Sequence, residues 1–254
     1  MARVLVFLVL ILGLVGCGQK PQSNNNNEES TEITVIGGKQ AIAIIKDHKL
    51  DFYDVEKNAL VLQSKNSFAI PKDNNGLFFL DTYTIGVVIK NEVNFYKNEN
   101  NGWHLSPGEH LTIPKDIDKI FGFGEYDWKS ICILKNDQII FYRQDDKGNW
   151  MKKDKKTLNL TDSVDNVFGL GSLSIGVVKH NSVYIYNDIE DDGNWELDPN
   201  PQISIPKGTD VIGFGQAMGL VNNHRLDLYI FNPVDHKWVK NSNPGIDINN
   251  VGSQ

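Results

Sequence analysis

The octet "VDNVFGLG" at residues 164–171 occurs in two further versions, "IDKIFGFG" at 117–124 and "GTDVIGFG" at 208–215. Each octet is followed by a short apolar run, a polar pair and an aromatic run ending in tyrosine, as in "GVVKHNSVYIY" at 176–186. Five such segments occur, and their final tyrosines lie 43, 46, 44 and 43 residues apart: Tyr53, Tyr96, Tyr142, Tyr186 and Tyr229. Agreement at one period over five copies indicates internal repeats.

Each repeat has the pattern of short β-strands. Apolar and polar residues alternate over runs such as Val183–Tyr186, which is strand periodicity, and no segment shows a sustained helical stripe. Polar pairs separate two such runs, as hairpin turns do, at Asn91-Glu92, Asn136-Asp137 and Asn223-His224. A tryptophan and then a segment such as "HLTIPK" follow in most copies. Each repeat therefore predicts four antiparallel strands.

Five four-stranded repeats of about 44 residues predict an all-β fold, a five-bladed β-propeller over residues 33–254. An open solenoid of hairpins is the alternative. We expect the strand that contains Gly-Val-Val to be innermost, the tryptophan to open a third strand, and the "IPK" segment to end a fourth. Proline cannot donate to a strand ladder, so Pro71, Pro114 and Pro206 should end the outer strands. The glycine-rich octets should then form the crossovers between blades.

The N-terminus has a different character. Residues 1–17 read "MARVLVFLVLILGLVGC", with one arginine and then an apolar run too short to span a bilayer but long enough for a signal peptide. The segment Leu14–Cys17 resembles the lipobox of bacterial lipoproteins, which implies that Cys17 carries lipid, palmitate included. The resemblance implies an exported protein anchored in a membrane, the outer one where there are two, because Gly18 replaces the aspartate that retains lipoproteins at the inner membrane.

Residues 18–32 contain no large apolar side chain after Gly18 and are rich in Asn, Ser and Glu, so we expect a flexible tether. Beyond the signal peptide, Cys132 is the only thiol, and its isoleucine neighbours predict a buried position. The order of strands, tryptophan and glycine-rich segment is similar to that in tachylectin-type five-bladed lectins. The Gly-Gly-Trp of that family is absent here, so its sugar-binding residues do not transfer.

Candidate ligand residues come from two patterns. The recurring tryptophans Trp103, Trp150, Trp195 and Trp238 follow polar loops of varying length, and could stack on a ligand or pack between blades. Tyr126 and Trp128 stand outside the repeat, which favours a specific contact. We expect the loops from tyrosine to tryptophan to share one face with the crossovers.

Three aspartates, Asp118, Asp165 and Asp210, occur within the glycine-rich motif and are expected to surround the mouth of the axial channel. They could bind a cation, act as acids and bases, or accept hydrogen bonds from backbone amides. The loop at 188–193 matches only the first half of a calcium loop, because Pro199 replaces the required glutamate. The histidines have no metal-ligand spacing, so no metal or cofactor is expected.

The formal charge of −7 excludes a nucleic-acid binder that acts through a basic face. Near-identical blades favour equivalent binding surfaces over a single catalytic pocket. The sequence therefore predicts a membrane-anchored, non-enzymatic module that binds a glycan or a protein outside the cytoplasm. A structural scaffold of the cell envelope and a glycoside hydrolase are the alternatives.

Overall fold

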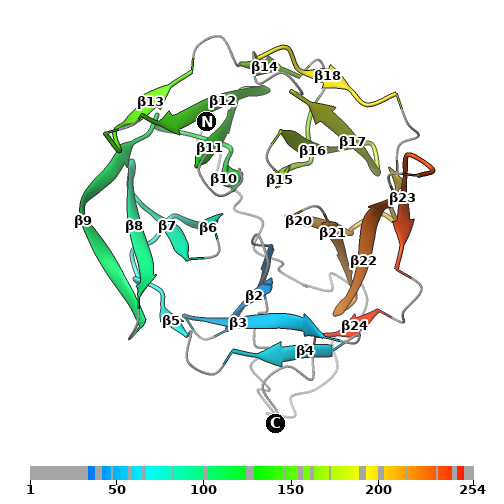
Figure 1. Ribbon diagram of the computed structural model, residues 1–254, viewed down its shortest axis with the longest axis horizontal. Helices are drawn as coiled ribbons and strands as arrows, with labels where there is room; N and C mark the ends of the chain where they lie inside the picture. Colours follow the sequence, from blue (N-terminus) through cyan, green and yellow to red (C-terminus); the bar gives the residue numbers. More distant parts are fainter. Residues whose placement is uncertain are drawn as a thin grey trace, which may run out of the picture.

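The five repeats fold into five antiparallel sheets, which a computed structural model arranges as a ring around a central axis (Figure 1). The prediction of an all-β, five-bladed propeller is confirmed. The structure describes residues 34–248 except 38–41, 47, 57–58, 64–66, 82, 100–101, 124–128, 146, 154–156, 161–162, 172, 189–192, 200–202, 216, 233 and 242–244. The predicted signal peptide, Cys17 and the tether lie outside the described residues.

The strands follow in chain order from blade to blade. Blade 1 contains β1 (Thr34–Gly37), β2 (Ile42–Lys46), β3 (Lys49–Glu56), β4 (Ala59–Leu62) and β5 (Phe68–Ala69). Blade 2 contains β6 (Gly76–Asp81), β7 (Thr84–Ile89), β8 (Glu92–Glu99) and β9 (Gly102–Thr112). Blade 3 contains β10 (Lys119–Phe123), β11 (Ser130–Lys135), β12 (Gln138–Gln144), β13 (Trp150–Lys152) and β14 (Leu158–Asn159). Blade 4 contains β15 (Asn166–Leu170), β16 (Ser174–Lys179), β17 (Ser182–Asn187), β18 (Glu196–Leu197) and β19 (Ile203–Ser204). Blade 5 contains β20 (Asp210–Phe214), β21 (Ala217–Asn222), β22 (Arg225–Asn232), β23 (Lys237–Lys240) and β24 (Ile246–Asp247).

The glycine-rich octets form the innermost strands, so their assignment to crossovers is wrong. β10, β15 and β20 each pair only with the Gly-Val-Val type of strand, which is second from the axis (Figure 1). The physical reason is crowding at the axis. A Cβ added to Gly122 would lie 2.0 Å from the Phe79 carbonyl oxygen of blade 2, and one added to Gly213 would lie 2.0 Å from the Gly169 oxygen of blade 4. Glycine lets neighbouring inner strands approach each other.

The outer edge of a blade also differs from the prediction. The tryptophan segment and the "IPK" segment are not successive strands, because both pair with the third strand of their blade. In blade 3, β12 pairs with β13 through Tyr142 and with β14 through Ile139. In blade 2 the two parts join into the single strand β9, with a shift of register between Asn94 and Tyr96. The prolines do follow the outer strands as predicted.

This topology defines two faces of the ring. Because successive strands are antiparallel, the loops between first and second strands share one face with the loops from tyrosine to tryptophan. We call this the loop face. The hairpin turns between second and third strands and the crossovers between blades share the opposite face, which we call the crossover face. The expectation that the tyrosine-to-tryptophan loops and the crossovers share a face is therefore wrong.

The hairpin turns on the crossover face have the backbone of tight two-residue turns. Asn136 and Asp137 both have positive φ, at 50° and 59°, and Asn223 and His224 repeat this at 48° and 60°. Asn and Asp tolerate this left-handed conformation better than most residues. The predicted turns at these two pairs are confirmed. The turn in blade 2 begins one residue earlier than predicted, at Lys90, because β8 already begins at Glu92.

Apolar packing between blades supplies the core. Within the described residues, five buried clusters lie at the five interfaces between neighbouring blades. The cluster that closes the ring joins Ile42, Ile44 and Tyr53 of blade 1 to Val221 and Leu226 of blade 5. No described strand of the first repeat pairs with one of the last, so no strand ladder joins these blades.

The close approach at the axis gives a first prediction. Gly122→Ala should destabilise the protein by about 3 kcal/mol, because its methyl group would collide with backbone that cannot move without shifting blade 2. Gly148→Ala is the control. Gly148 has a φ of 83°, but a Cβ added there would meet open space. We therefore expect the control to lose about 1 kcal/mol of stability, from backbone strain alone. Urea unfolding measures both, and equal losses would contradict the crowding argument.

Candidate functional site

The recurring tryptophans lie between blades. Trp103 stacks on Phe52 of blade 1 at 5.1 Å between ring centroids, Trp150 on Phe95 of blade 2 at 5.2 Å, and Trp195 on Phe141 of blade 3 at 4.8 Å. Trp238 follows a different pattern, since its ring is tilted at 58° to Phe231 of its own strand pair and also packs on the cluster of blades 4 and 5. All four are half-buried. Of the two roles considered for these tryptophans, packing between blades accounts for the contacts described here. Binding of a ligand by the exposed edges of their rings stays a prediction.

The polar loops of the loop face use their first side chain to order their own backbone. The Asp145 carboxylate accepts hydrogen bonds from the backbone amides of Lys147 (2.9 Å) and Asn149 (2.8 Å). In blade 4, Asp188 is buried and accepts a hydrogen bond from the Gly193 amide at 3.0 Å. These contacts explain why Asp recurs there without a ligand. Tyr126 and Trp128, which the sequence singles out, lie outside the described residues.

The three predicted aspartates occupy two different positions. Asp118 and Asp165 immediately precede the inner strands and are exposed, and Asp118 accepts a hydrogen bond from the Asn136 turn amide at 2.9 Å. Asp210 lies one residue further along, as the first residue of β20. A shift of one residue places a side chain on the other side of a strand. The structure therefore does not bring the three carboxylates together.

Asp210 instead occupies the position of Lys119 in blade 3 and Asn166 in blade 4. These three residues begin β20, β10 and β15 on the crossover face, and we call them the inner-strand cluster. The Lys119 ammonium donates to the Asn166 side-chain oxygen, and the buried Asn166 amide donates to the Val211 carbonyl at 2.9 Å. The cluster therefore links blades 3, 4 and 5. Sequence reasoning missed Lys119 and Asn166, although the third residue of the octets is Lys, Asn and Asp in turn.

Burial perturbs both titratable members of the cluster. Although part of the Lys119 side chain is accessible, burial of its ammonium lowers its pKa to about 8, an effect that the Asp210 carboxylate opposes. Burial raises the pKa of Asp210 to about 6, an effect that Lys119 opposes. In both groups the loss of hydration outweighs the attraction between them. The cluster therefore costs stability when both groups are charged.

Two other predictions concern metal and thiol chemistry. Within the described residues, His, Cys, Asp and Glu side chains form no group of three that could hold a metal ion. Cys132 is fully buried, as its neighbours predicted, and burial raises the pKa of its thiol well above the usual range. This thiol is therefore unreactive packing. The part of the chain that the structure covers includes no helix with the length and hydropathy for crossing a membrane.

Comparisons with known proteins extend only to the fold. No protein-family model matches the sequence, and no curated protein is similar to it. Among solved structures, the WD40 domain of SCAP from fission yeast matches at 10% identity and a TM-score of 0.44, over 87% of this chain and 58% of that chain. This chain thus spans less than two thirds of that relative.

Two further structures are similar at the same level. A functionally unknown protein from Desulfotomaculum acetoxidans has 11% identity and a TM-score of 0.48, over 84% of this chain and 70% of that chain. A putative 6-phosphogluconolactonase from Bacteroides fragilis has 10% identity and a TM-score of 0.44, over 84% of this chain and 70% of that chain. Such likeness carries no argument about activity.

The perturbed pair gives a pH prediction. Since folding raises the pKa of Asp210, its contribution to stability is full below pH 3.8 and is lost as the pH rises through about 6. Since folding lowers the pKa of Lys119, its contribution is full above pH 10.5 and is lost as the pH falls through about 8. The pair should therefore stabilise the protein least between about pH 6 and 8.

The double variant Lys119→Met, Asp210→Asn tests this dependence. Solvent screening reduces the effect. We expect the free energy of unfolding of the wild type to fall by about 1 kcal/mol relative to that of the variant between pH 4 and 7, and to rise again by a similar amount by pH 10. Urea unfolding of both proteins across this range measures the difference. A difference that does not change with pH would contradict the assignment.

Proposed function

We propose that the protein is a membrane-anchored, non-enzymatic binding module that presents its crossover face to a protein outside the cytoplasm. The inner-strand cluster is the observation that carries this proposal. Well-packed apolar side chains are often as stable as a buried ionic group or more so. Polar groups that cost stability at the mouth of a rigid ring are typical of a functional surface.

Several contacts favour a protein over a glycan as the partner. Sugars commonly bind on a free aromatic face. One face of Trp103, Trp150 and Trp195 is already covered by a phenylalanine of the neighbouring blade. The crossover face offers exposed charged residues instead, among them Lys72, Lys115 and Lys207. Such a mixed polar surface suits a protein partner.

The hydrolase alternative has less support. A glycosidase needs two carboxyl groups about 5 to 9.5 Å apart across one cleft. In the inner-strand cluster the neighbours of Asp210 are an ammonium and an amide rather than a second carboxyl group. Asp118 is engaged in ordering a hairpin turn. A scaffold role in the envelope would itself use a protein-binding face, so it differs from the proposal mainly in the number of partners.

The anchor part of the proposal rests on Leu14–Cys17 alone. Cells grown with labelled palmitate should incorporate the label into the wild-type protein, and Cys17→Ser should abolish this labelling. The variant keeps the apolar run and the export signal, so both proteins should leave the cytoplasm. Because this apolar run can itself hold the variant at the membrane, the label is the readout, and labelling of the variant would contradict lipid attachment at Cys17.

A pair of photo-crosslinking positions tests the binding face. Lys207 lies on the crossover between β19 and β20, and Lys147 lies on the loop face between β12 and β13, and both are exposed. A photoreactive amino acid at 207 in the anchored protein should capture one partner protein, whereas the same group at 147 should not. Equal capture at both positions, or at neither, would contradict the proposal. Saturable binding on a glycan array without protein capture would indicate a lectin instead.

A further inference from the structure

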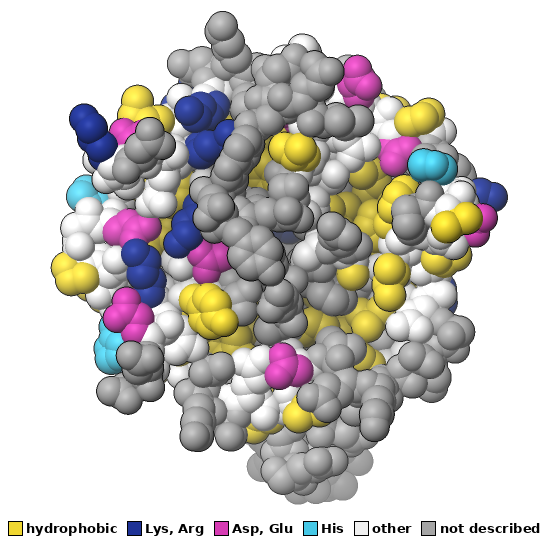
Figure 2. All heavy atoms as spheres, viewed as in Figure 1, with side chains coloured by type: hydrophobic (Ala, Val, Ile, Leu, Met, Phe, Trp, Pro, Cys, Tyr) yellow, Lys and Arg dark blue, Asp and Glu magenta, His cyan; other side chains and the backbone are white. Residues whose placement is uncertain are grey.

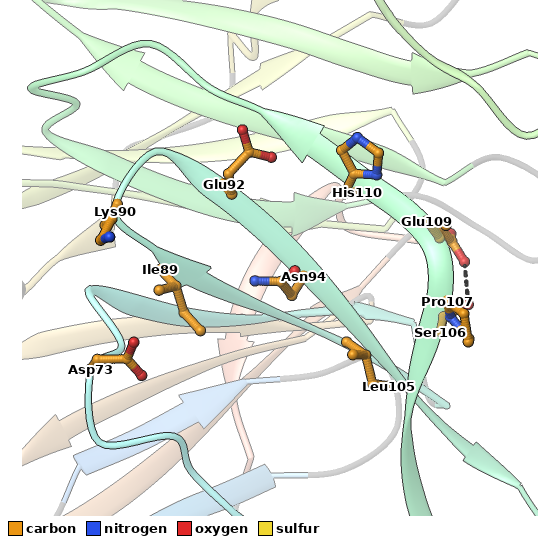
Figure 3. A pocket seen from close by; sticks show the side chains of 11 residues that line it. Asp73, Ile89, Lys90, Glu92, Asn94, Leu105, Ser106, Pro107, Glu109 and His110 are labelled. Carbon is orange, nitrogen blue, oxygen red and sulfur yellow. Dashed lines mark hydrogen bonds between the residues drawn. The ribbon is translucent and has the colours of Figure 1, made fainter.

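A groove of ≈ 400 Å³ opens on the crossover side of blade 2 (Figure 3). Its walls come from the crossover at Asp73, the turn at Lys90, β8 and the stretch 105–110 of β9. In Figure 3, Asp73 and Lys90 lie on one side, Leu105 and Pro107 on the other, and Asn94 between them. Figure 2 shows that acidic, basic and histidine side chains gather over this blade, at the left of the ring.

One reason for the groove is a short polar side chain at one position of the third strand, where two other blades have a large one. Blade 3 has Ile140 there and blade 4 has Tyr184, and both pack on apolar clusters between blades. Blade 2 has the shorter Asn94, whose side chain forms no hydrogen bond with any described residue. The equivalent Asp51 of blade 1 and Asp227 of blade 5 are instead paired with Lys49 at 2.9 Å and with Lys240 at 2.7 Å. Of these three polar side chains, only Asn94 has no described partner that fills the space beside it.

A bulge in β9 forms the far wall. Asn94 pairs with His110 and Tyr96 pairs with Leu105, so the four residues 106–109 lie opposite the single residue Phe95. Gly108 has a φ of 81°, which with the preceding proline is typical of a type II turn. The bulge turns Leu105 outward, where it is 51% exposed.

Glu109 fixes this bulge and is not free to bind a ligand. Its carboxylate contacts the Lys97 ammonium at 2.5 Å and accepts hydrogen bonds from Gln144 of blade 3 at 2.7 Å and from Ser106 at 3.0 Å. Burial would raise its pKa, but these partners together lower it below the usual value, so it stays charged and paired. The wall of the groove is therefore ordered without a partner.

The remaining lining combines apolar side chains with carboxylates that have no ion pair among the described residues. Ile89, Leu105 and Pro107 supply the apolar surface. Asp73 has no ion pair within the described residues, and Glu92 accepts only one hydrogen bond there, from the Thr112 hydroxyl at 2.9 Å. Lys90 is the one Lys or Arg of the described lining, which also includes His110. Two carboxylates without an ion pair, against one ammonium, favour a positively charged guest.

We propose that this groove binds a lysine or arginine side chain of the protein partner, an inference that rests on the proposed function. The aliphatic stem would lie along Ile89 and Leu105, and the charged head would reach Glu92 and Asp73. Long cationic side chains bury their stems on apolar surface while the head stays polar, which fits this lining. An anionic guest would meet both carboxylates, and a sugar would find no Trp, Tyr or Phe ring to stack on among the described lining residues.

Matched peptides test the chemistry of the guest. The probe is a blocked peptide of Gly and Ser with one central lysine, titrated by NMR into the full-length protein in detergent. Peptides with norleucine or glutamate at the central position serve as controls. The lysine peptide should bind best, the norleucine peptide more weakly and the glutamate peptide least. Equal binding of the lysine and norleucine peptides would overturn the proposal.

Variants locate the site. Glu92→Gln can still accept a hydrogen bond from Thr112, and it should weaken binding of the lysine peptide about fivefold. Asp73→Asn should weaken this binding about threefold. Lys90→Ala should strengthen it about twofold, because a like charge is removed. Glu196→Gln on β18 of blade 4 makes the same charge change far from the groove and should have no effect. Tighter binding of the glutamate peptide, or equal effects of Glu92→Gln and Glu196→Gln, would overturn the inference.

The two proposals fail separately. If the lysine peptide does not bind but position 207 still captures a partner, the groove inference is wrong and the binding face stands. If the lysine peptide binds as described but position 207 captures no protein, the groove chemistry is right and the proposed face is wrong.

Discussion

The absence of a Cβ atom at Gly122, Gly169 and Gly213 is the constraint on which the ring depends. A ring of few blades has little room at its axis, and at these positions atoms of the neighbouring blade occupy the place of a side chain. Each inner strand can then contact the next. Once the inner strands are fixed, the second and third strands must diverge, and the gaps between them are filled by Phe, Ile, Val and the stacked tryptophans. Small residues at the axis and large residues toward the rim thus set the shape of each blade.

The sequence predicts the architecture well because the same pattern of residues recurs in every blade at a nearly constant period. The tyrosines, the tryptophans and the prolines after the outer strands recur together, and this fixes the number and boundaries of the blades. The order within a blade was harder to predict. Both the octet and the Gly-Val-Val run contain glycine, and both are buried on two faces. A strand buried on both faces lacks alternation. Without that signal the octet could not be distinguished from a connection.

The candidate site could be predicted only in part. Asp210 is recognisable, but the aspartates of the other two octets lie one residue earlier in the repeat, so an alignment by residue type groups side chains that point to different sides. Lys119, Asn166 and Asp210 share the third position of the octets, but the strand pairing is needed to show that this position begins an inner strand. The groove of blade 2 depends on a missing large side chain at Asn94 and on a bulge, and neither has a sequence motif.

Each sheet is built from one uninterrupted stretch of chain, and no described strand crosses from the last repeat to the first. This has a consequence for how the gene can change. Copying or deleting a whole repeat leaves every backbone ladder complete, and only the apolar surfaces on either side must find new neighbours. Unequal recombination within such a gene would therefore yield foldable intermediates. The similarity of the octets, kept while the surface of each blade diverged, is the record expected of such a history.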